Sequence, residues 1–353
     1  MNDGKVTMQQ VAAEAGVSAM TVSHVLRGTG RVGEDTRKRV KQAAAELGHR
    51  PNRSAQSMRG GRYGNVALVL STDRTRSELH SDLLRGIHRS LSRHKLHLSM
   101  TELDDDRLSN DDYMAHILQS LAADGLLLNY KWHTPPALIE LIDRFHLPVV
   151  WVADRYAYDS VYPDLYNGIR EATQRVIDLG HRRIAHLGIQ EAPANCDPLE
   201  HIHHSVSDCL RGYTDTMQHA GLDAWSIELQ KHPAALSDAL AAPNRPTALI
   251  CRGVHAANRA MLSAAQAGLR VPEDISIVPL CHETGHHLGL RCAQIVMPTL
   301  SLGEAAVDML ADKIAQPEAA LPSRAIPMEW KDGPTLGTGR TERRKNGKMT
   351  EKR

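Results

Sequence analysis

Short helical patterns of apolar residues, each ending at a glycine, fill the first fifty positions of the chain. A first helix begins after Thr7, a candidate N-cap, and ends at Gly16, because glycine accepts the left-handed conformation of a helix end. A second helix, Ala19 to Leu26, follows Ser18 as its cap. Two short helices joined by a tight turn are typical of a helix-turn-helix unit.

A third helix and a linker complete this N-terminal segment. The pattern predicts a helix over Glu34–Leu47, with Gly48 as its stop. Three helices of this size bury a small core, which is too little for an enzyme active site. Residues 50–62 contain a proline and a Gly-Gly pair, so we expect a linker with at most one marginal helix.

From Asn65 onward, short apolar runs alternate with helical stretches. The predicted strands are Val66–Leu70, Leu96–Met100, Gly125–Leu128, Pro148–Val152, Ile184–Gly188, Ala248–Cys251 and Ile275–Leu280. The predicted helices are Leu79–Arg93, Tyr113–Ala122, Pro136–Phe145, Leu165–Leu179, Asp208–Ala220 and Ala256–Ala267. This alternation indicates parallel sheets covered by helices, in two lobes with a ligand cleft at the carboxyl ends of the strands. No internal repeat is visible in the sequence.

The net charge of +1 conceals an asymmetry along the 353 residues. Residues 1–62 hold eleven Lys and Arg against five Asp and Glu, and residues 340–353 hold seven against two. These segments therefore carry +6 and +5, which leaves −10 for the residues between them. A compact basic head on an acidic body favours a polyanionic partner for the head, although basic ends that merely aid solubility explain the charge equally well.

Composition and motifs narrow the class of protein. The five cysteines form no CxxC pair and indicate reduced thiols in a cytoplasm, and we expect neither a secretion signal nor a membrane span. The sequence contains no GxSxG, no GxxxxGK[ST] and no HExxH, and the neighbours Cys281 and His282 rarely give catalytic geometry. We therefore expect no enzymatic activity.

A series of segments then carries a family resemblance over roughly residues 5 to 336. In the head these segments are Val6–Ala12, Ala15–Ser18, Thr21–Ser23, Thr36-Arg37, Glu46–Gly48 and Pro51-Asn52. In the body they are Leu84–Ile87, Asp124-Gly125, Pro148–Val150, Leu179–Ala185, Gly212-Tyr213, Arg245–Ala248 and Gly268–Asp274. The chain resembles the lactose-repressor (LacI/GalR) family of transcriptional regulators in this order of segments.

The resemblance implies an α/β fold with a DNA-reading head and a sensor. We expect a three-helix helix-turn-helix domain over residues 1–50, a hinge helix over 51–62, a two-lobed periplasmic-binding-protein-like α/β/α domain over 63–338, and a basic disordered tail over 339–353. The implied function is that of a dimeric, sequence-specific regulator of transcription, by family default a repressor, which acts on double-stranded DNA in the cytoplasm at the nucleoid. The resemblance implies no cofactor and no membrane partner.

Family positions assign DNA contacts in the head and the linker. In the head they are Thr7, Ser18, Ala19, Met20, Thr21, Ser23 and His24, of which Ala19, Met20 and His24 face the bases. In the linker they are Asn52, Ala55, Gln56 and Met58. Met58 stands where the family inserts a leucine into a minor-groove step, and a methionine can serve as such a wedge. Because two hinges must meet, a dimer and a near-palindromic operator are implied.

The expected effector site departs from the family pattern. The candidate residues are Asp73, His80, Asp164, Cys209, Arg252 and Cys281. Cys209 and Cys281 occupy positions where the family carries a ligand-gripping arginine and an aspartate, and aromatic residues make up only 4% of the chain. Three interpretations stay open: an unusual sugar or sugar derivative, a ligand that is not a sugar, or a cleft without a ligand in which regulation comes through a partner or through protein level.

Two loops are rich in metal-ligating residue types. One contains Cys196, His201, His203 and His204, and the other contains Cys281, His282, His286 and His287. Their spacing matches no standard zinc finger, and a chain with twenty histidines forms such clusters by chance. The sequence therefore predicts no metal site.

Overall fold

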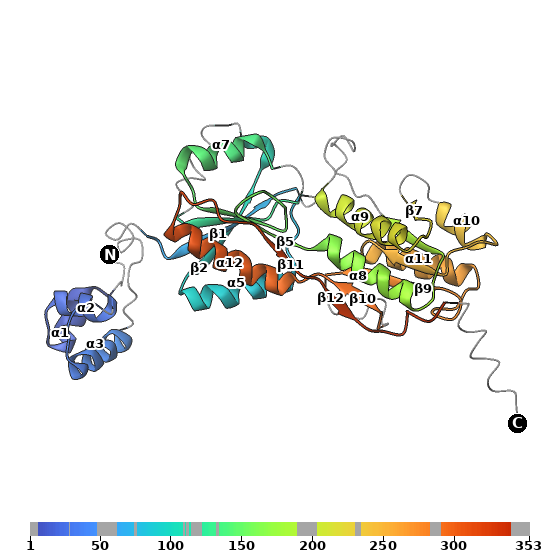
Figure 1. The fold of residues 1–353 in the computed structure, drawn as a ribbon. Coiled ribbons are helices and arrows are strands. Elements are labelled where there is room, and N and C mark those ends of the chain that lie inside the picture. Colours follow the sequence, from blue (N-terminus) through green and yellow to red (C-terminus); the bar gives the residue numbers. More distant parts are fainter. Residues whose placement is uncertain are drawn as a thin grey trace, which may run out of the picture. The chain divides into compact units, whose positions relative to one another are not determined.

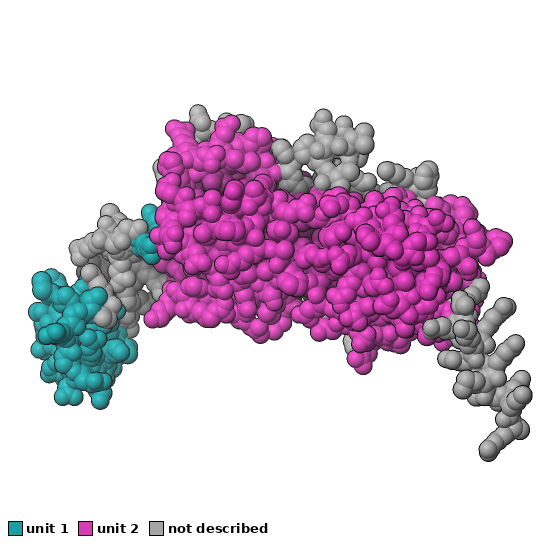
Figure 2. Space-filling view, in the orientation of Figure 1, with its two compact units in different colours: residues 1–63 teal, residues 64–353 magenta. Residues whose placement is uncertain are grey.

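The computed structural model divides the chain into two compact units, residues 1–63 and 64–353 (Figure 2). The structure describes residues 6–27, 29–47, 62–73, 76–108, 110, 113, 122–131, 134–188, 203–229, 234–282 and 291–339. Each unit is described by itself below.

The described residues of the first unit form three helices around a small apolar core (Figure 1). They are α1 (Met8–Ala15), α2 (Ala19–Arg27) and α3 (Glu34–Glu46). Thr7 caps α1 in a capping box with Gln10, and Gly16 ends it with a φ of 64°, which is the left-handed conformation expected of glycine there. Val11, Val22 and Val40, one from each helix, are wholly buried, so the core joins all three helices.

Lobe 1 of the second unit is a six-stranded sheet between helices. Its strand order is β11-β5-β4-β3-β1-β2, and every pairing is parallel. The strands are β1 (Asn65–Ser71), β2 (His97–Leu103), β3 (Gly125–Leu128), β4 (Val149–Val152), β5 (Ser160–Pro163) and β11 (Arg324–Ile326). Helices α5 (Ser81–His94) and α12 (Thr299–Ala315) pack on one face, and α7 (Pro136–Phe145) covers the other (Figure 1). A short 3-10 helix, η1 (Asp105–Arg107), follows β2.

Lobe 2 repeats this plan. Its strand order is β12-β10-β9-β8-β6-β7, in which β10 and β12 are antiparallel and the other pairs are parallel. The strands are β6 (Ile184–Gly188), β7 (Trp225–Glu228), β8 (Ala248–Cys251), β9 (Ser276–Cys281), β10 (Gln294–Val296) and β12 (Glu329–Lys331). Helices α8 (Leu165–Asp178) and α9 (His204–His219) share one apolar core, and α10 (Ala235–Ala241) and α11 (Val254–Gln266) share the other.

The chain passes between the lobes three times, from β5 to α8, from β10 to α12 and from β11 to β12. Residues that follow β1, β3 and β4 in lobe 1 meet residues of lobe 2 that follow β9 or begin α9. This is where ligands bind in open parallel sheets. No helix within the described ranges is long and apolar enough to cross a membrane.

Several predicted boundaries are wrong in a way that matters for function. Helix α9 begins at His204, four residues before the predicted start, because the His203 side chain caps it by accepting from the Ser205 backbone N–H. The strand predicted to end at Met100 continues to Leu103. Most of the helix predicted over 113–122 lies outside the described residues.

Candidate functional site

Helix α2 of the first unit has a buried face and an exposed face. Val22 and Val25 are buried, whereas Ala19, Met20 and His24 are exposed, with Met20 at 71% of its full accessibility. Thr21 and Ser23 are half-buried between these faces. The first turn is held by Ser18, whose Oγ accepts the backbone N–H of Thr21 at 3.1 Å and bonds the Thr21 hydroxyl at 2.9 Å.

The loop after α2 positions His24. Nδ1 of His24 lies 3.3 Å from the Thr29 hydroxyl. The Arg37 guanidinium of α3 donates to the carbonyl oxygens of Gly30 and Val32, each at 3.1 Å. Gly30 has a φ of 76°, a conformation that favours glycine, and a Cβ on it would lie 3.0 Å from His24 Nδ1 and push that ring aside by a few tenths of an ångström. The sequence-based assignment missed Arg37 and Gly30, while Asn52, Ala55, Gln56 and Met58 lie outside the described residues.

At the edge of lobe 1 that faces lobe 2, Asp105 collects three donors. It accepts from the Ser71 hydroxyl at 2.7 Å, from Arg76 at 3.1 Å and from the Tyr130 hydroxyl at 2.9 Å. Burial raises the pKa of Tyr130, so this phenol stays a donor. The candidate Asp73 lies half-exposed in the loop after β1, with its carboxylate 3.5 Å from the Arg76 guanidinium.

A second group joins the lobes through two imidazoles. His80 of lobe 1 and His282 of lobe 2 stack with ring centroids 3.9 Å apart. Glu78 lies 3.5 Å from His80 Nε2 and forms an ion pair with Lys131. The neighbouring His80 ring, together with Lys131, holds the pKa of Glu78 well below its usual range.

A third group lies where the loop after β4 meets the start of α9. Arg155 of lobe 1 donates to the Asp208 carboxylate of lobe 2 at 2.8 Å, and the Asp208 side chain is 4% exposed. Asp154 Oδ1 lies 3.4 Å from His203 Nε2 and 3.6 Å from His204 Nε2. Burial, with the neighbouring His203 second, lowers the pKa of His204, so its ring is neutral.

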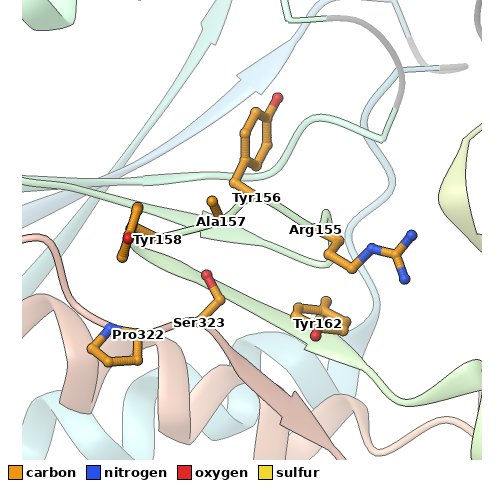
Figure 3. Close-up of a pocket in the computed structure, with 7 residues that line it drawn as sticks. All are labelled: Arg155, Tyr156, Ala157, Tyr158, Tyr162, Pro322 and Ser323. Carbon is orange, nitrogen blue, oxygen red and sulfur yellow. The ribbon is translucent and has the colours of Figure 1, made fainter.

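An open pocket of about 550 Å³ adjoins this group on the lobe 1 side (Figure 3). It is lined by Arg155, Tyr156, Ala157, Tyr158, Tyr162, Pro322 and Ser323. In Figure 3 the Arg155 guanidinium extends away from the other labelled side chains. This guanidinium is the group that donates to Asp208 of lobe 2. Stacking of Tyr156 on Trp151, with centroids 4.3 Å apart, supplies an aromatic surface beside the pocket.

The six candidate effector residues come from different elements of the two lobes, and Arg252 lies close enough to Cys209 to lower the pKa of that thiol against the effect of burial. His80 contacts lobe 2, and Arg252 lies near the buried His186, whose pKa falls to about 4 through burial and through Arg252. Asp164 caps α8 by accepting the Asn167 backbone N–H at 3.2 Å. Cys209 and Cys281 are wholly buried, so their sulfurs have no exposed surface to offer a ligand.

The residues that do converge between the lobes were in part missed from the sequence. Glu78, Lys131, Asp154, Arg155 and Asp208 were not among the candidates. Their only sequence signal is position, because Lys131, Asp154 and Arg155 each stand two or three residues beyond the end of a strand of lobe 1.

Comparisons with known proteins agree with this architecture. Residues 7–52 match the model of the bacterial regulatory proteins of the lacI family, and residues 173–336 match a periplasmic binding protein-like domain. The HTH-type transcriptional repressor PurR of Escherichia coli O139:H28 is 27% identical over 320 residues, which cover 87% of this chain and 90% of the relative. PurR of Shigella boydii serotype 18 matches equally well.

Solved structures share the fold along nearly the whole chain. The lac repressor dimer bound to operator and the anti-inducer ONPF has a TM-score of 0.72 at 23% identity, covering 95% of this chain and all of the other. A complex of the transcriptional regulator CelR with cellobiose has a TM-score of 0.61 at 23% identity, covering 94% of this chain and all of the other.

A helix-turn-helix unit followed by a two-lobed, periplasmic-binding-protein-like domain defines a class of transcriptional regulators. The chain carries the DNA-binding domain of the lacI family of bacterial regulatory proteins, followed by a periplasmic binding protein-like domain.

Proposed function

We propose that this regulator represses transcription by binding a near-palindromic operator in double-stranded DNA as a homodimer, and that a small polar effector bound between the lobes modulates this binding. It has no enzymatic activity of its own and works in the cytoplasm, where the chromosomal DNA lies. The observation that carries the proposal is the exposed face of α2, on a helix whose opposite face is buried and whose first turn is capped.

The chemistry of this face suits the major groove. In a helix-turn-helix the second helix enters that groove, and its N-terminal side chains reach the base edges. Ala19 and Met20 offer apolar contact of the kind that thymine methyl groups accept. His24 offers one polar contact where an arginine could grip guanine at two points, so the preferred operator should differ from sites read by an arginine there.

Dimerisation follows from the linker. Met58 occupies the family position of the leucine that opens a minor-groove step, and paired hinges would contribute one wedge each, at an unstacking cost of a few kcal/mol. The repressors and the operator-bound dimer among the similar proteins support a two-fold site.

A polar effector is favoured by the groups that face each other between the lobes. The described residues there are mainly charged or able to donate and accept hydrogen bonds, with Trp151 and Tyr156 as the stacked aromatic pair. A sugar or sugar derivative suits such a surface, and the cellobiose complex of a regulator with the same fold supports this class.

The proposal is tested by selecting bound sequences from a random DNA pool with the full-length protein. We expect a near-palindromic site to be enriched, and we expect Met20→Glu to abolish the enrichment because a carboxylate would face the groove. Met100→Glu is the matched control, since Met100 is 48% exposed on β2 of lobe 1, and it should select the wild-type site. Met58→Gly should weaken binding to that site.

Two outcomes would contradict the proposal. Equal enrichment by wild type and by Met20→Glu would show that α2 does not read DNA. No enrichment at low salt, with or without pooled metabolites, would remove the operator-binding function.

A further inference from the structure

We propose that a divalent transition-metal ion of the zinc class binds to Asp154, His203 and His204 and thereby bridges the two lobes. Asp154 follows β4 of lobe 1, whereas His203 and His204 begin α9 of lobe 2. One oxygen and two ring nitrogens of these residues lie within 4.8 Å of one another. This site goes beyond the proposed function, which requires no metal.

The two separations between Asp154 and the histidines match a coordination polyhedron better than they match hydrogen bonds. Tetrahedral zinc binds nitrogen and oxygen at about 2.0–2.1 Å, which places neighbouring ligand atoms roughly 3.3 Å apart. Oδ1 of Asp154 lies 3.4 Å and 3.6 Å from the two Nε2 atoms. An N–H···O hydrogen bond is normally about 2.7–3.2 Å long, so neither imidazole is in ordinary hydrogen-bond contact with this carboxylate.

The surrounding contacts orient the rings as metal ligands are oriented. Nδ1 of His204 lies 3.3 Å from the Asp208 carboxylate, to which it can donate, leaving the Nε2 lone pair directed at Asp154. A histidine whose other nitrogen donates to a carboxylate is the usual arrangement around a bound metal. Nδ1 of His203 lies 2.8 Å from the Ser205 hydroxyl, and the Arg155 backbone N–H holds Asp154 Oδ1 at 2.8 Å.

Burial makes the arrangement costly without an ion. The side chains of His203, His204 and Asp154 are 10%, 9% and 17% exposed. Nε2 of His204 is buried and has no hydrogen-bond partner among the residues that the structure describes. A buried polar atom without a partner costs about 1–3 kcal/mol, which a coordinate bond would offset.

The ligand set itself carries the negative charge that a cation needs. The Asp208 carboxylate is paired with the guanidiniums of Arg155 at 2.8 Å and of Arg211 at 3.9 Å. The carboxylate of Asp154 therefore supplies the charge that counteracts the repulsion that the N-terminus of α9 exerts on a cation. Imidazole ligands favour zinc and its neighbours over magnesium or calcium, and three protein ligands leave a fourth position for water or an effector atom.

The site can be tested on the full-length protein after chelation and dialysis. Titration with Zn²⁺ followed by calorimetry should reveal a site that His204→Gln and Asp154→Asn each weaken by about a hundredfold or more. His219→Gln is the matched control, because His219 is an exposed histidine at the other end of α9, and it should leave this site unchanged. Co²⁺ in place of Zn²⁺ should give the visible absorption of a tetrahedral centre in wild type and in the control only.

Bridging is tested by unfolding. A ligand that binds only the folded protein raises its stability, so Zn²⁺ should raise the unfolding midpoint of wild type and of His219→Gln but not of Asp154→Asn. Circular dichroism establishes whether each variant is folded. If His204→Gln does not fold, Asp154→Asn alone tests the site.

Three results would overturn the proposal: no Zn²⁺ bound by the wild-type protein, binding that none of the ligand substitutions weakens, or binding that survives Asp154→Asn and so involves lobe 2 alone. Because binding is measured without DNA, these results leave the operator-binding function untouched. A failed operator selection would equally leave the metal site standing.

Discussion

The imidazole rings of His80 and His282 lie face to face across the two lobes, with centroids 3.9 Å apart and an angle of 16° between the ring planes. Burial, followed by the neighbouring His80 and Lys131, lowers the pKa of His282 to about 3, while Glu78 opposes them. The stacked arrangement therefore depends on a neutral His282 ring.

This dependence predicts that acid weakens the protein through His282. The pKa of His282 is about 3 in the folded protein and about 6.5 in the unfolded chain. Between about pH 6.5 and about pH 3 the unfolded chain therefore binds a proton that the folded protein does not bind. The free energy of unfolding falls as the pH drops through this range. From about pH 7 to about pH 5 the loss amounts to roughly 2 kcal/mol of unfolding free energy. Urea unfolding at both pH values measures it.

The variant His282→Gln isolates this contribution, because glutamine cannot be protonated and other buried histidines stay in place. We expect it to lose about 2 kcal/mol less than wild type over the same pH step. His97→Gln, on exposed β2, is the control and should behave as wild type. If His282→Gln and wild type lost equal stability, the closed stack would not be coupled to protonation.

Local patterns were sufficient to predict the head and the buried strands. The caps Thr7 and Ser18 and the stop at Gly16 are short-range signals, and all three lie where the sequence placed them. Strands Ile184–Gly188 and Ala248–Cys251 were also predicted at their observed bounds, because each is a short, wholly buried apolar run.

Other elements carry no such signal. Strands β10, β11 and β12 have three residues each, and they exist because the chain crosses between lobes and pairs with strands far away in sequence. Helix α12 was not predicted from the alternating pattern, and the two lobes repeat one strand order although the sequence shows no repeat.

The inter-lobe groups could not be read from spacing either. Asp154 and His204 are fifty residues apart in the chain, and only the meeting of two sheets brings them together. Burial of a side chain is likewise not visible in the sequence. The family position of Cys209 can be read from the sequence, but the fact that this side chain of α9 is enclosed in the apolar core cannot.

The packing of α5 on α12 predicts a severe effect of adding one methyl group. A Cβ on Gly86 would overlap the backbone carbonyl oxygen of Leu300, and backbone cannot move aside as a flexible side chain can. Overpacking costs about 3 kcal/mol here, against about 1 kcal/mol that alanine gains over glycine in a helix. Gly86→Ala should therefore lose about 2 kcal/mol of unfolding free energy in urea.

The control for this substitution lies on the exposed face of the same helix. His88→Ala should change the unfolding free energy by less than about 0.5 kcal/mol. A Gly86→Ala protein as stable as His88→Ala would mean that the two helices do not approach as closely as the structure has them.

The described cysteines should resist alkylation as long as the protein is folded. Cys209, Cys251, Cys281 and Cys292 are buried free thiols, and burial raises the pKa of Cys209 and of Cys281 to about 12. The thiolate is the form that reacts, and a pKa three or more above that of an ordinary thiol lowers the thiolate fraction about a thousandfold. The reaction slows by this factor even before exclusion of the reagent from the core is counted. Alkylation by iodoacetamide, followed by mass spectrometry of the Cys196→Ser variant, measures the rate at each position.

The control is Met20→Cys in the same variant, which provides an exposed reference cysteine on α2 that should react at once. Denaturant should make all sites react equally fast. If Cys281 reacted in the folded protein as fast as the reference cysteine, the end of β9 would be open to solvent and the lobes would not be closed over it.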